Sequence, residues 1–356
     1  MEYGVLENGK PFDTVNLYSQ VTYPFSDVLR GTLGLRYSET DQQYSYELYL
    51  TENPCSNPNA FTVVCPTTDT LVENANYSAS EKQNNTDWKV GFEYDLTEES
   101  MLYGNIATGF KAGGVQLRDS SEAITSLSEP LELGSFNPEK TLSYELGMKN
   151  RLFDNKLQLN GAVFYTEWDD LQINTFTCPA STPDCIPGSG DSFAVFLNVA
   201  DSTQYGLEFD SVWLVTDNDR VNFSGTAMHG RYGDGGYYGF GGTYIDLTDK
   251  KMVQVPAFAA NLGYSHVFKI GAGSLTATVE GEYSSEYETT HESNLDGHTQ
   301  PSYFRNNISL TYEYESIIVN AYVRNIQEES TIQSVFPFGV QASDPRLYGV
   351  SVSYDF

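Results

Sequence analysis

Residues 347–356 read Leu-Tyr-Gly-Val-Ser-Val-Ser-Tyr-Asp-Phe. Aromatic and β-branched side chains take every second position, at Tyr348, Val350, Val352, Tyr354 and Phe356, with small or polar residues between them. Because successive side chains of a β-strand point to opposite faces, the segment predicts a strand with one apolar and one polar face.

The same alternation recurs upstream, in residues 88–95, 141–150, 274–283 and 307–314. The polar positions of these segments carry ionised groups such as Lys89, Glu145 and Glu280, so that face must meet water. The apolar positions include aromatic residues near the strand ends, as at a membrane interface. A charge on a lipid face would cost about 2–4 kcal/mol near the midplane. The pattern therefore favours transmembrane strands over a half-buried soluble sheet.

Short and long connections alternate strictly along the chain. The short ones lie at 24–27, 97–100, 153–155, 216–219, 269–273 and 315–316, and the long polar ones at roughly 50–83, 111–136, 176–192, 232–252, 288–301 and 327–345. Outer-membrane barrels alternate periplasmic turns with longer outer loops in this way. We therefore expect an all-β, antiparallel, up-and-down transmembrane β-barrel with about thirteen strands present. A strand at about 13–23 would run inward, and the C-terminus would be periplasmic.

The composition agrees with this fold class. The chain has 356 residues, including 26 Tyr, 20 Phe and 30 Gly, and no run approaches the length of a transmembrane helix. The start, Met1 to Val5, has neither a basic region nor an apolar core, so no secretory signal is visible. Because an outer-membrane protein must be exported, we expect the chain to be incomplete at its N-terminus.

The formal net charge is −29, which argues against a nucleic-acid partner because such proteins need a basic surface. Two interpretations of the acidity stay open. It marks either a pore or loops that attract cations, or simply a solvated acidic exterior.

Four cysteines form two close pairs, Cys55 with Cys65 and Cys178 with Cys185. Both pairs lie in segments rich in Pro, Asn, Ser and Thr within the long connections. Zinc sites usually have closer spacing and further ligands at set distances. Loop disulfides in an oxidising compartment fit the pattern better.

Signatures of catalysis are missing. The chain has no Gly-x-Ser-x-Gly elbow, no phosphate-binding loop and no His-Glu-x-x-His sequence, so we predict no catalytic residue and no cofactor. His291 and His298 share one loop with Glu292 and Asp296. Contact with a metal or haem is one interpretation of that loop, and a solvated polar loop is the other; we assign no metal site.

The segment 232–244 is rich in glycine and aromatic residues, namely Tyr232, Tyr237, Tyr238, Phe240 and Tyr244. An outer loop of this kind can stack on a ligand or donate hydrogen bonds to it. The alternative is an interfacial aromatic girdle with turn glycines.

Several segments, taken in order, resemble one known family. Residues 102–114 read Leu-Tyr-Gly-Asn-Ile-Ala-Thr-Gly-Phe-Lys-Ala-Gly-Gly, and Phe136-Asn-Pro-Glu-Lys140 and Ser143-Tyr-Glu-Leu-Gly-Met-Lys149 follow. Further matching segments are Phe164-Tyr165 with Asp169-Asp-Leu-Gln172, Tyr205-Gly-Leu-Glu208, Val323-Arg-Asn-Ile326 and Pro345-Arg-Leu-Tyr-Gly349. Together, across residues 88–356, they resemble the barrel of TonB-dependent outer-membrane receptors.

This resemblance implies a barrel of about 22 strands closed by an N-terminal plug. Residues 1–356 would be the C-terminal portion of that barrel, without the plug, the signal peptide or the TonB-contacting segment. It further implies a Gram-negative outer-membrane location among lipids and active, TonB-coupled uptake of a scarce small-molecule ligand such as a ferric siderophore or another iron complex. We expect Tyr354 and Phe356 to form a signal for the barrel assembly machinery.

Three other functions stay open at this point. A passive porin-like channel would share the alternating strands, although it would lack the quoted segments. A soluble or surface-attached all-β binding protein would also show alternation. A non-functional fragment is the third possibility.

Overall fold

The computed structural model describes residues 2–7, 13–52, 70–118, 132–177, 193–239, 244–292, 295, 297–336 and 339–355. In these segments one antiparallel sheet of fourteen strands is accompanied by five two-stranded sheets. No helix within them has the length and apolar composition needed to cross a membrane. The fold class is therefore all-β, as predicted.

The large sheet is an up-and-down meander, in which each strand pairs with the next strand of the sheet along the chain. β1 and β2 both pair with β3, at residues 46–51 and 30–41 respectively, so they share one position and the sheet has thirteen positions. The strands are β1 (Glu2–Glu7), β2 (Asp13–Pro24), β3 (Leu29–Glu52), β4 (Thr70–Thr97), β5 (Ser100–Lys111), β8 (Glu139–Leu152), β9 (Leu157–Asp169), β12 (Ser202–Leu214), β13 (Asp219–Tyr232), β16 (Phe258–Ile270), β17 (Gly273–Ser284), β20 (Tyr303–Tyr314), β21 (Ile317–Arg324) and β24 (Leu347–Tyr354).

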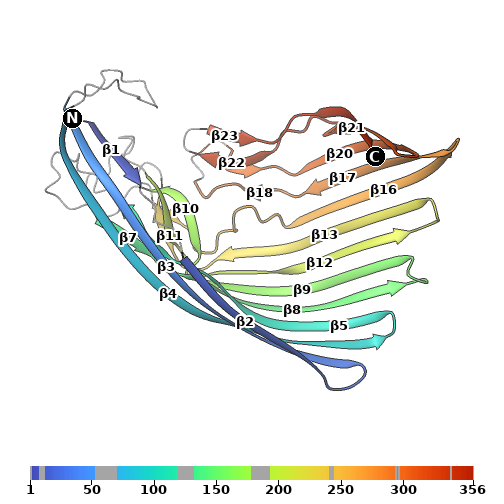
Figure 1. Cartoon of the computed structure of the whole chain (residues 1–356), viewed down its shortest axis with the longest axis horizontal. Coiled ribbons are helices and arrows are strands. Elements are labelled where there is room, and N and C mark those ends of the chain that lie inside the picture. The colour runs from blue at the N-terminus through green and yellow to red at the C-terminus, as the bar shows by residue number, and fades with distance from the viewer. Residues whose placement is uncertain are drawn as a thin grey trace.

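The two ends of the sheet differ. Tight turns join successive strands at one end, here called the turn end, and additional hairpins lie at the other, here called the loop end (Figure 1). The hairpins are β6 (Gly114–Arg118) with β7 (Glu132–Phe136), β10 (Gln172–Thr177) with β11 (Phe193–Asn198), β14 (Gly236–Tyr238) with β15 (Tyr244–Asp246), β18 (Tyr287–Glu288) with β19 (Thr299–Gln300), and β22 (Ile332–Phe336) with β23 (Gly339–Ala342). The C-terminus lies at the turn end (Figure 1). The predicted alternation of short and long connections is therefore confirmed.

The sheet curves strongly and, within the described residues, does not close on itself, because the β1/β2 position and β24 are its two edges (Figure 1). Cross-strand register keeps the apolar side chains on one face from strand to strand. One row of that face reads Val221, Tyr264, Val279, Ile308, Val323 and Tyr348. On this face of β24 the side chains are very exposed, Tyr348 at 81% and Val350 at 73%, as expected for side chains that meet lipid.

One boundary was predicted wrongly. The range 50–83 was expected to be a polar connection, yet β3 continues to Glu52 and β4 begins at Thr70. Residues 46–51 of β3 pair with β1 on one side and with β4 on the other. Residues 80–85 of β4 are all polar, so no alternation marks that part of the strand, whereas Tyr44, Tyr46, Leu48 and Leu50 of β3 do take every second position.

Candidate functional site

The loop end has its own hydrophobic core. The buried residues are Val199, Ala200, Tyr232, Tyr237, Ile245 and Leu247, and Leu171, Ile173, Leu197 and Met252 pack against them. Leu247 is fully buried, at 0% exposure. Burying a side chain of this size contributes about 1.5–3 kcal/mol. The segments that follow β9, β11 and β13 therefore form a packed layer over the end of the sheet.

His291 is part of this layer. Its Nε2 lies 2.9 Å from the Tyr232 hydroxyl, and the two rings meet edge to face with centroids 4.7 Å apart. Burial lowers the pKa of His291 to about 4, with a smaller contribution from the charge of Lys250. Burial likewise raises the pKa of Tyr232 to about 12. Both groups are thus neutral at neutral pH, and their bond ties the loop after β17 to the end of β13.

The second predicted histidine is engaged separately. His298 places Nδ1 3.2 Å from the carbonyl oxygen of Leu295. Asp296 lies outside the described residues. In the segments that the structure describes, no three His, Cys, Asp or Glu side chains are arranged to hold a metal ion.

The predicted aromatic ligand contacts divide into two groups. Tyr232 and Tyr237 are buried, at 4% and 6% exposure, whereas Tyr238 and Tyr244 are 43% and 52% exposed. The exposed pair comes from β14 and β15, with ring centroids 5.3 Å apart in an edge-to-face arrangement. Phe240 lies outside the described residues. Among the described members of this aromatic set, Tyr238 and Tyr244 therefore have exposed ring surface.

The glycine-rich segment after β5 is held by side-chain amides. Gly113 receives a hydrogen bond from Gln42 Nε2 at its carbonyl (3.0 Å) and donates from its N–H to Gln83 Oε1 (2.9 Å). A Cβ at Gly113 would lie 2.3 Å from the carbonyl oxygen of Phe136. Only glycine allows this approach of the segments after β5 and β7, which accounts for the residue at this position.

The neighbouring Asn-Pro-Glu segment is held in a similar way. Gln172 donates from Nε2 to the carbonyls of Ala112 and Asn137, each at 3.0 Å, and its N–H donates to Glu139 Oε2 at 2.9 Å. Asn198 donates from Nδ2 to the carbonyl of Asn137 at 3.0 Å. Gln172 at the start of β10 and Asn198 at the end of β11 thus cross-link the segments that follow β5 and β7.

A second aromatic pair, in which Phe136 is half-buried and Phe196 is exposed, was not predicted from the sequence. The rings of Phe136 and Phe196 stack with centroids 5.3 Å apart. Gln116 fixes this pair, donating from Nε2 to the Phe196 carbonyl at 2.7 Å and accepting the Phe196 N–H at 2.8 Å. Phe196 is 38% exposed. The loop end therefore offers two aromatic pairs on well-supported hairpins.

The polar face of the sheet carries paired charges. The guanidinium of Arg30 binds both carboxylate oxygens of Asp95 (2.6 and 2.8 Å) and one oxygen of Glu93 (2.9 Å). Arg305 pairs with Glu282 in the same manner, at 3.0 and 3.1 Å. Such charge-assisted bonds satisfy ionised groups on a face that meets water.

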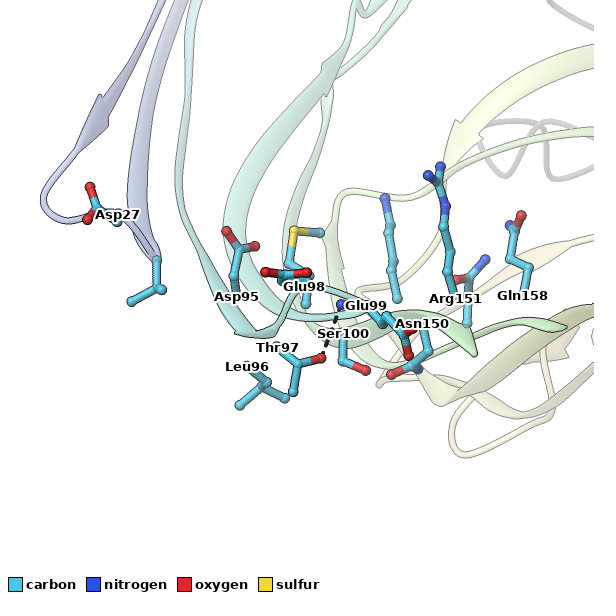
Figure 2. Close-up of a pocket in the computed structure, with 14 residues that line it drawn as sticks. Asp27, Asp95, Leu96, Thr97, Glu98, Glu99, Ser100, Asn150, Arg151 and Gln158 are labelled. Atoms are coloured by element: carbon cyan, nitrogen blue, oxygen red, sulfur yellow. Dashed lines mark hydrogen bonds between the residues drawn. The ribbon is translucent and has the colours of Figure 1, made fainter. Parts of the chain in front are cut away.

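An open cavity of about 790 Å³ lies at the turn end of this face. Figure 2 shows Asp95, Arg151 and Gln158 extending to one side of the sheet, whereas Leu96 points away. Lys149 also lines the cavity and lies 5.2 Å from the centroid of the Tyr103 ring. Among the described residues neither Lys149 nor Arg151 forms an ion pair. Charge on this face is therefore not confined to acidic groups.

Other predicted positions lie outside the described residues, namely Cys55, Cys65, Cys178, Cys185 and Phe356. Their disulfide and assembly roles stay predictions. Tyr354, the other predicted assembly residue, is 58% exposed on the apolar face of β24. What the described side chains offer is stacking and hydrogen bonding at the loop end, which suits binding.

Comparison with known proteins gives consistent matches. The sequence model of the family described as "TonB dependent receptor-like, beta-barrel" matches residues 4–326. A probable TonB-dependent siderophore receptor, PiuA of Acinetobacter baumannii, is 22% identical over 207 residues, or 56% of this chain and 25% of that protein.

Solved structures show the same fold. The ferric yersiniabactin uptake receptor FyuA of Yersinia pestis superposes with a TM-score of 0.71 at 16% identity, covering 97% of this chain and 46% of that one. The ferric-catecholate import receptor Fiu of Escherichia coli K12, in its closed form, gives 0.68 at 16% identity, covering 97% and 45%. The chain thus spans less than half the length of these relatives.

Proposed function

The chain belongs to the TonB-dependent receptor family of β-barrels, and we propose that it serves, within the full-length protein, in outer-membrane uptake of a scarce small molecule driven through TonB. A ferric siderophore or another iron complex is the proposed ligand class, because PiuA, FyuA and Fiu are described as receptors for such compounds. The TonB complex would act through the N-terminal part of the protein, and the barrel assembly machinery would insert the strands.

This proposal rests on the family match over residues 4–326. The loop end supports it with ordered aromatic side chains that can contact a ligand. A scarce ligand needs a preformed surface, since ordering loops upon binding would reduce affinity. The core around Leu247 and the bond between His291 and Tyr232 supply that order. Tyr238 and Tyr244 then present exposed rings from a supported hairpin.

The sheet itself has no chemical step in this scheme. Its polar face keeps ionised pairs such as Arg30 with Asp95 in contact with water. Its apolar face meets lipid. In the full-length protein the sheet would act as a rigid wall around the pathway, and energy would be applied to the segment that fills it.

The test is uptake of radiolabelled iron complexes by cells that carry the full-length gene, with and without TonB. Uptake should require TonB, and uptake that persists without it would instead indicate a passive channel. Replacing both Tyr238 and Tyr244 with Ala should weaken ligand binding by about fivefold or more, because aromatic contacts are worth about 0.5–1.5 kcal/mol each beyond their buried area. Tyr314→Ala at the turn end is the matched control. Equal affinity in the loop variant and the control would refute the binding role of the loop.

A further inference from the structure

On the apolar face of β9, β12 and β13 the side chains become more polar towards the loop end. Three successive cross-strand rows, from the apolar one outward, are Val163–Leu207–Ala227, Tyr165–Tyr205–His229 and Glu167–Thr203–Arg231. The rings of Tyr165 and Tyr205 are stacked 6.4 Å apart, and those of Tyr205 and His229 are 5.3 Å apart. Tyrosine rings concentrate where membrane meets water. The third row therefore lies at the level of the outer-leaflet headgroups, on the lipid-facing side.

Arg231 is held rigidly in this third row. Its Nε donates to His229 Nε2 at 3.1 Å, and its Nη1 donates to the carbonyl oxygen of Asp249. Both acceptors are uncharged, since a ring nitrogen that accepts a hydrogen bond carries no proton. The guanidinium is thus oriented by its neighbours, and neither of these two acceptors is a carboxylate.

Lys251 adds a second positive charge. It is the cross-strand partner of Arg231, so the two side chains share a face. Lys251 is exposed, and in the described residues neither it nor Arg231 forms an ion pair. The acid in the same row, Glu167, lies two strands away, or about 10 Å. Its carboxylate accepts a hydrogen bond from the Tyr165 hydroxyl at 3.1 Å.

We propose that Arg231 and Lys251 form a binding site for the phosphate of an outer-leaflet lipid headgroup. A guanidinium fork matches the geometry of two phosphate oxygens, and the neighbouring ammonium supplies a further charge. The rings of Tyr205 and His229 lie directly below, where the less polar part of the lipid would pack. In a chain with a net charge of −29, two adjacent cationic side chains that form no ion pair in the described residues are distinctive on the lipid-facing side.

The site has a connection to the loop end. Residues 249–252 are bound to β13 through the Arg231–Asp249 contact and through bonds from Tyr232 N–H to Lys250 O (3.0 Å) and Met252 N–H to Gly230 O (3.1 Å). This segment continues directly from the buried Leu247. A lipid phosphate on Arg231 would therefore stabilise the border of the loop core as well as the barrel wall.

The experiment uses the full-length receptor in nanodiscs of phosphatidylcholine with added phosphatidic acid, and native mass spectrometry counts the retained phosphatidic acid. The double variant Arg231→Gln and Lys251→Gln should bind it about tenfold more weakly, since it loses the charge-assisted hydrogen bonds to the phosphate. Hydrogen exchange of residues 249–252 should increase in the same variant. Arg220→Gln is the matched control, because it removes a charge from the other end and the other face of β13 and should retain wild-type binding.

Two outcomes would overturn the inference. One is equal retention of phosphatidic acid by the double variant and the wild type, with both folded as judged by heat-modifiable migration. The other is full displacement of the lipid by inorganic phosphate, which would indicate a site for free anions. The inference is independent of transport, so a receptor that binds the lipid but fails to take up iron complexes would refute only the proposed function.

Discussion

The imidazole of His291 stands edge-on to the ring of Tyr232, with its Nε2 2.9 Å from the tyrosine hydroxyl. One residue follows β17 and the other ends β13, so this contact links two segments that the sheet itself does not pair at the loop end. Because of this contact, the order of the loop end depends on the protonation state of His291.

Acidification should loosen this link. The pKa of His291 is about 4 in the folded protein, below its ordinary value of 6.5, so the unfolded loop binds the proton more tightly. The stabilisation that neutral His291 gives to the folded loop is therefore complete above about pH 6.5. It falls as the pH drops towards 4 and changes no further below that. A loss of about 2 kcal/mol is expected by about pH 5. Hydrogen exchange of residues 285–292 should increase accordingly.

The control for this prediction is His291→Phe, which keeps an aromatic ring and removes the titrating group. In that variant the exchange of the same residues should depend no more on pH than does the exchange of β17. An unchanged pH response in His291→Phe would assign the effect to another group.

Leu247 is expected to determine the order of the loop end. Leu247→Ala should destabilise this layer by about 2–5 kcal/mol, because a fully buried leucine leaves a cavity. Ligand affinity should fall while the barrel still forms, since the sheet does not depend on this side chain. Leu262→Ala, at a position that is 54% exposed on the apolar face, is the control and should change neither quantity. Proteolysis of intact cells measures the order of the loop end, and heat-modifiable migration measures whether the barrel has formed.

Gly113→Ala should distort the junction of the segments after β5 and β7. The added Cβ would lie 2.3 Å from the Phe136 carbonyl oxygen, so the backbone must shift and release the bonds from Gln42 and Gln83. A cost of about 1–3 kcal/mol is expected, as for other overpacked sites. Gly339→Ala is the matched control because no atom lies within 4 Å of its added Cβ. Thermal denaturation should give a lower midpoint for Gly113→Ala than for Gly339→Ala. Equal midpoints would show that the segment accommodates the added methyl group without cost.

The orientation of β24 can be tested by placing a charge on each face. Val350→Arg should cost about 2–4 kcal/mol because the side chain would lie in lipid. Ser351→Arg, one residue on, should be tolerated because that face meets water. Outer-membrane assembly of the full-length protein is the measurement. Comparable loss of assembly in both variants would contradict the assigned faces.

The strands and turns of the sheet could be predicted from the sequence, but the contacts at the loop end could not. Alternation at Tyr348, Val350 and Val352 reports directly which face meets lipid, so strands and turns could be predicted. Residues 80–85 of β4 lack that signal because all six are polar, and the alternation at Tyr44, Tyr46, Leu48 and Leu50 in β3 was not extended into the range assigned to a connection. The amide contacts of Gln42, Gln83 and Gln172 depend on tertiary distances, and isolated glutamines in a sequence have no pattern that reveals them.

The aromatic set at 232–244 shows the same limit. Composition could suggest that these aromatic residues contact a ligand. It could not show that, of two adjacent residues, Tyr237 is buried and Tyr238 is exposed. Phe136 and Phe196 are 60 positions apart in the sequence and were not associated at all. The predicted disulfides, Cys55 with Cys65 and Cys178 with Cys185, stay predictions that thiol labelling of intact cells would test.

Gln116 pairs with the backbone of Phe196 through both atoms of its amide, in the way that a neighbouring strand would. Gln116, the Phe136–Phe196 stack and the hydrogen bonds of Gln172 and Asn198 to Asn137 join the hairpins β6–β7 and β10–β11. These are side-chain contacts, whereas strands within each hairpin and within the barrel are joined by continuous backbone ladders. Few bonds must break to part the two hairpins, and none of them belongs to the barrel. Parting these two hairpins would therefore break side-chain contacts and leave the backbone ladders of the sheet intact, so such an opening needs no unfolding of the barrel.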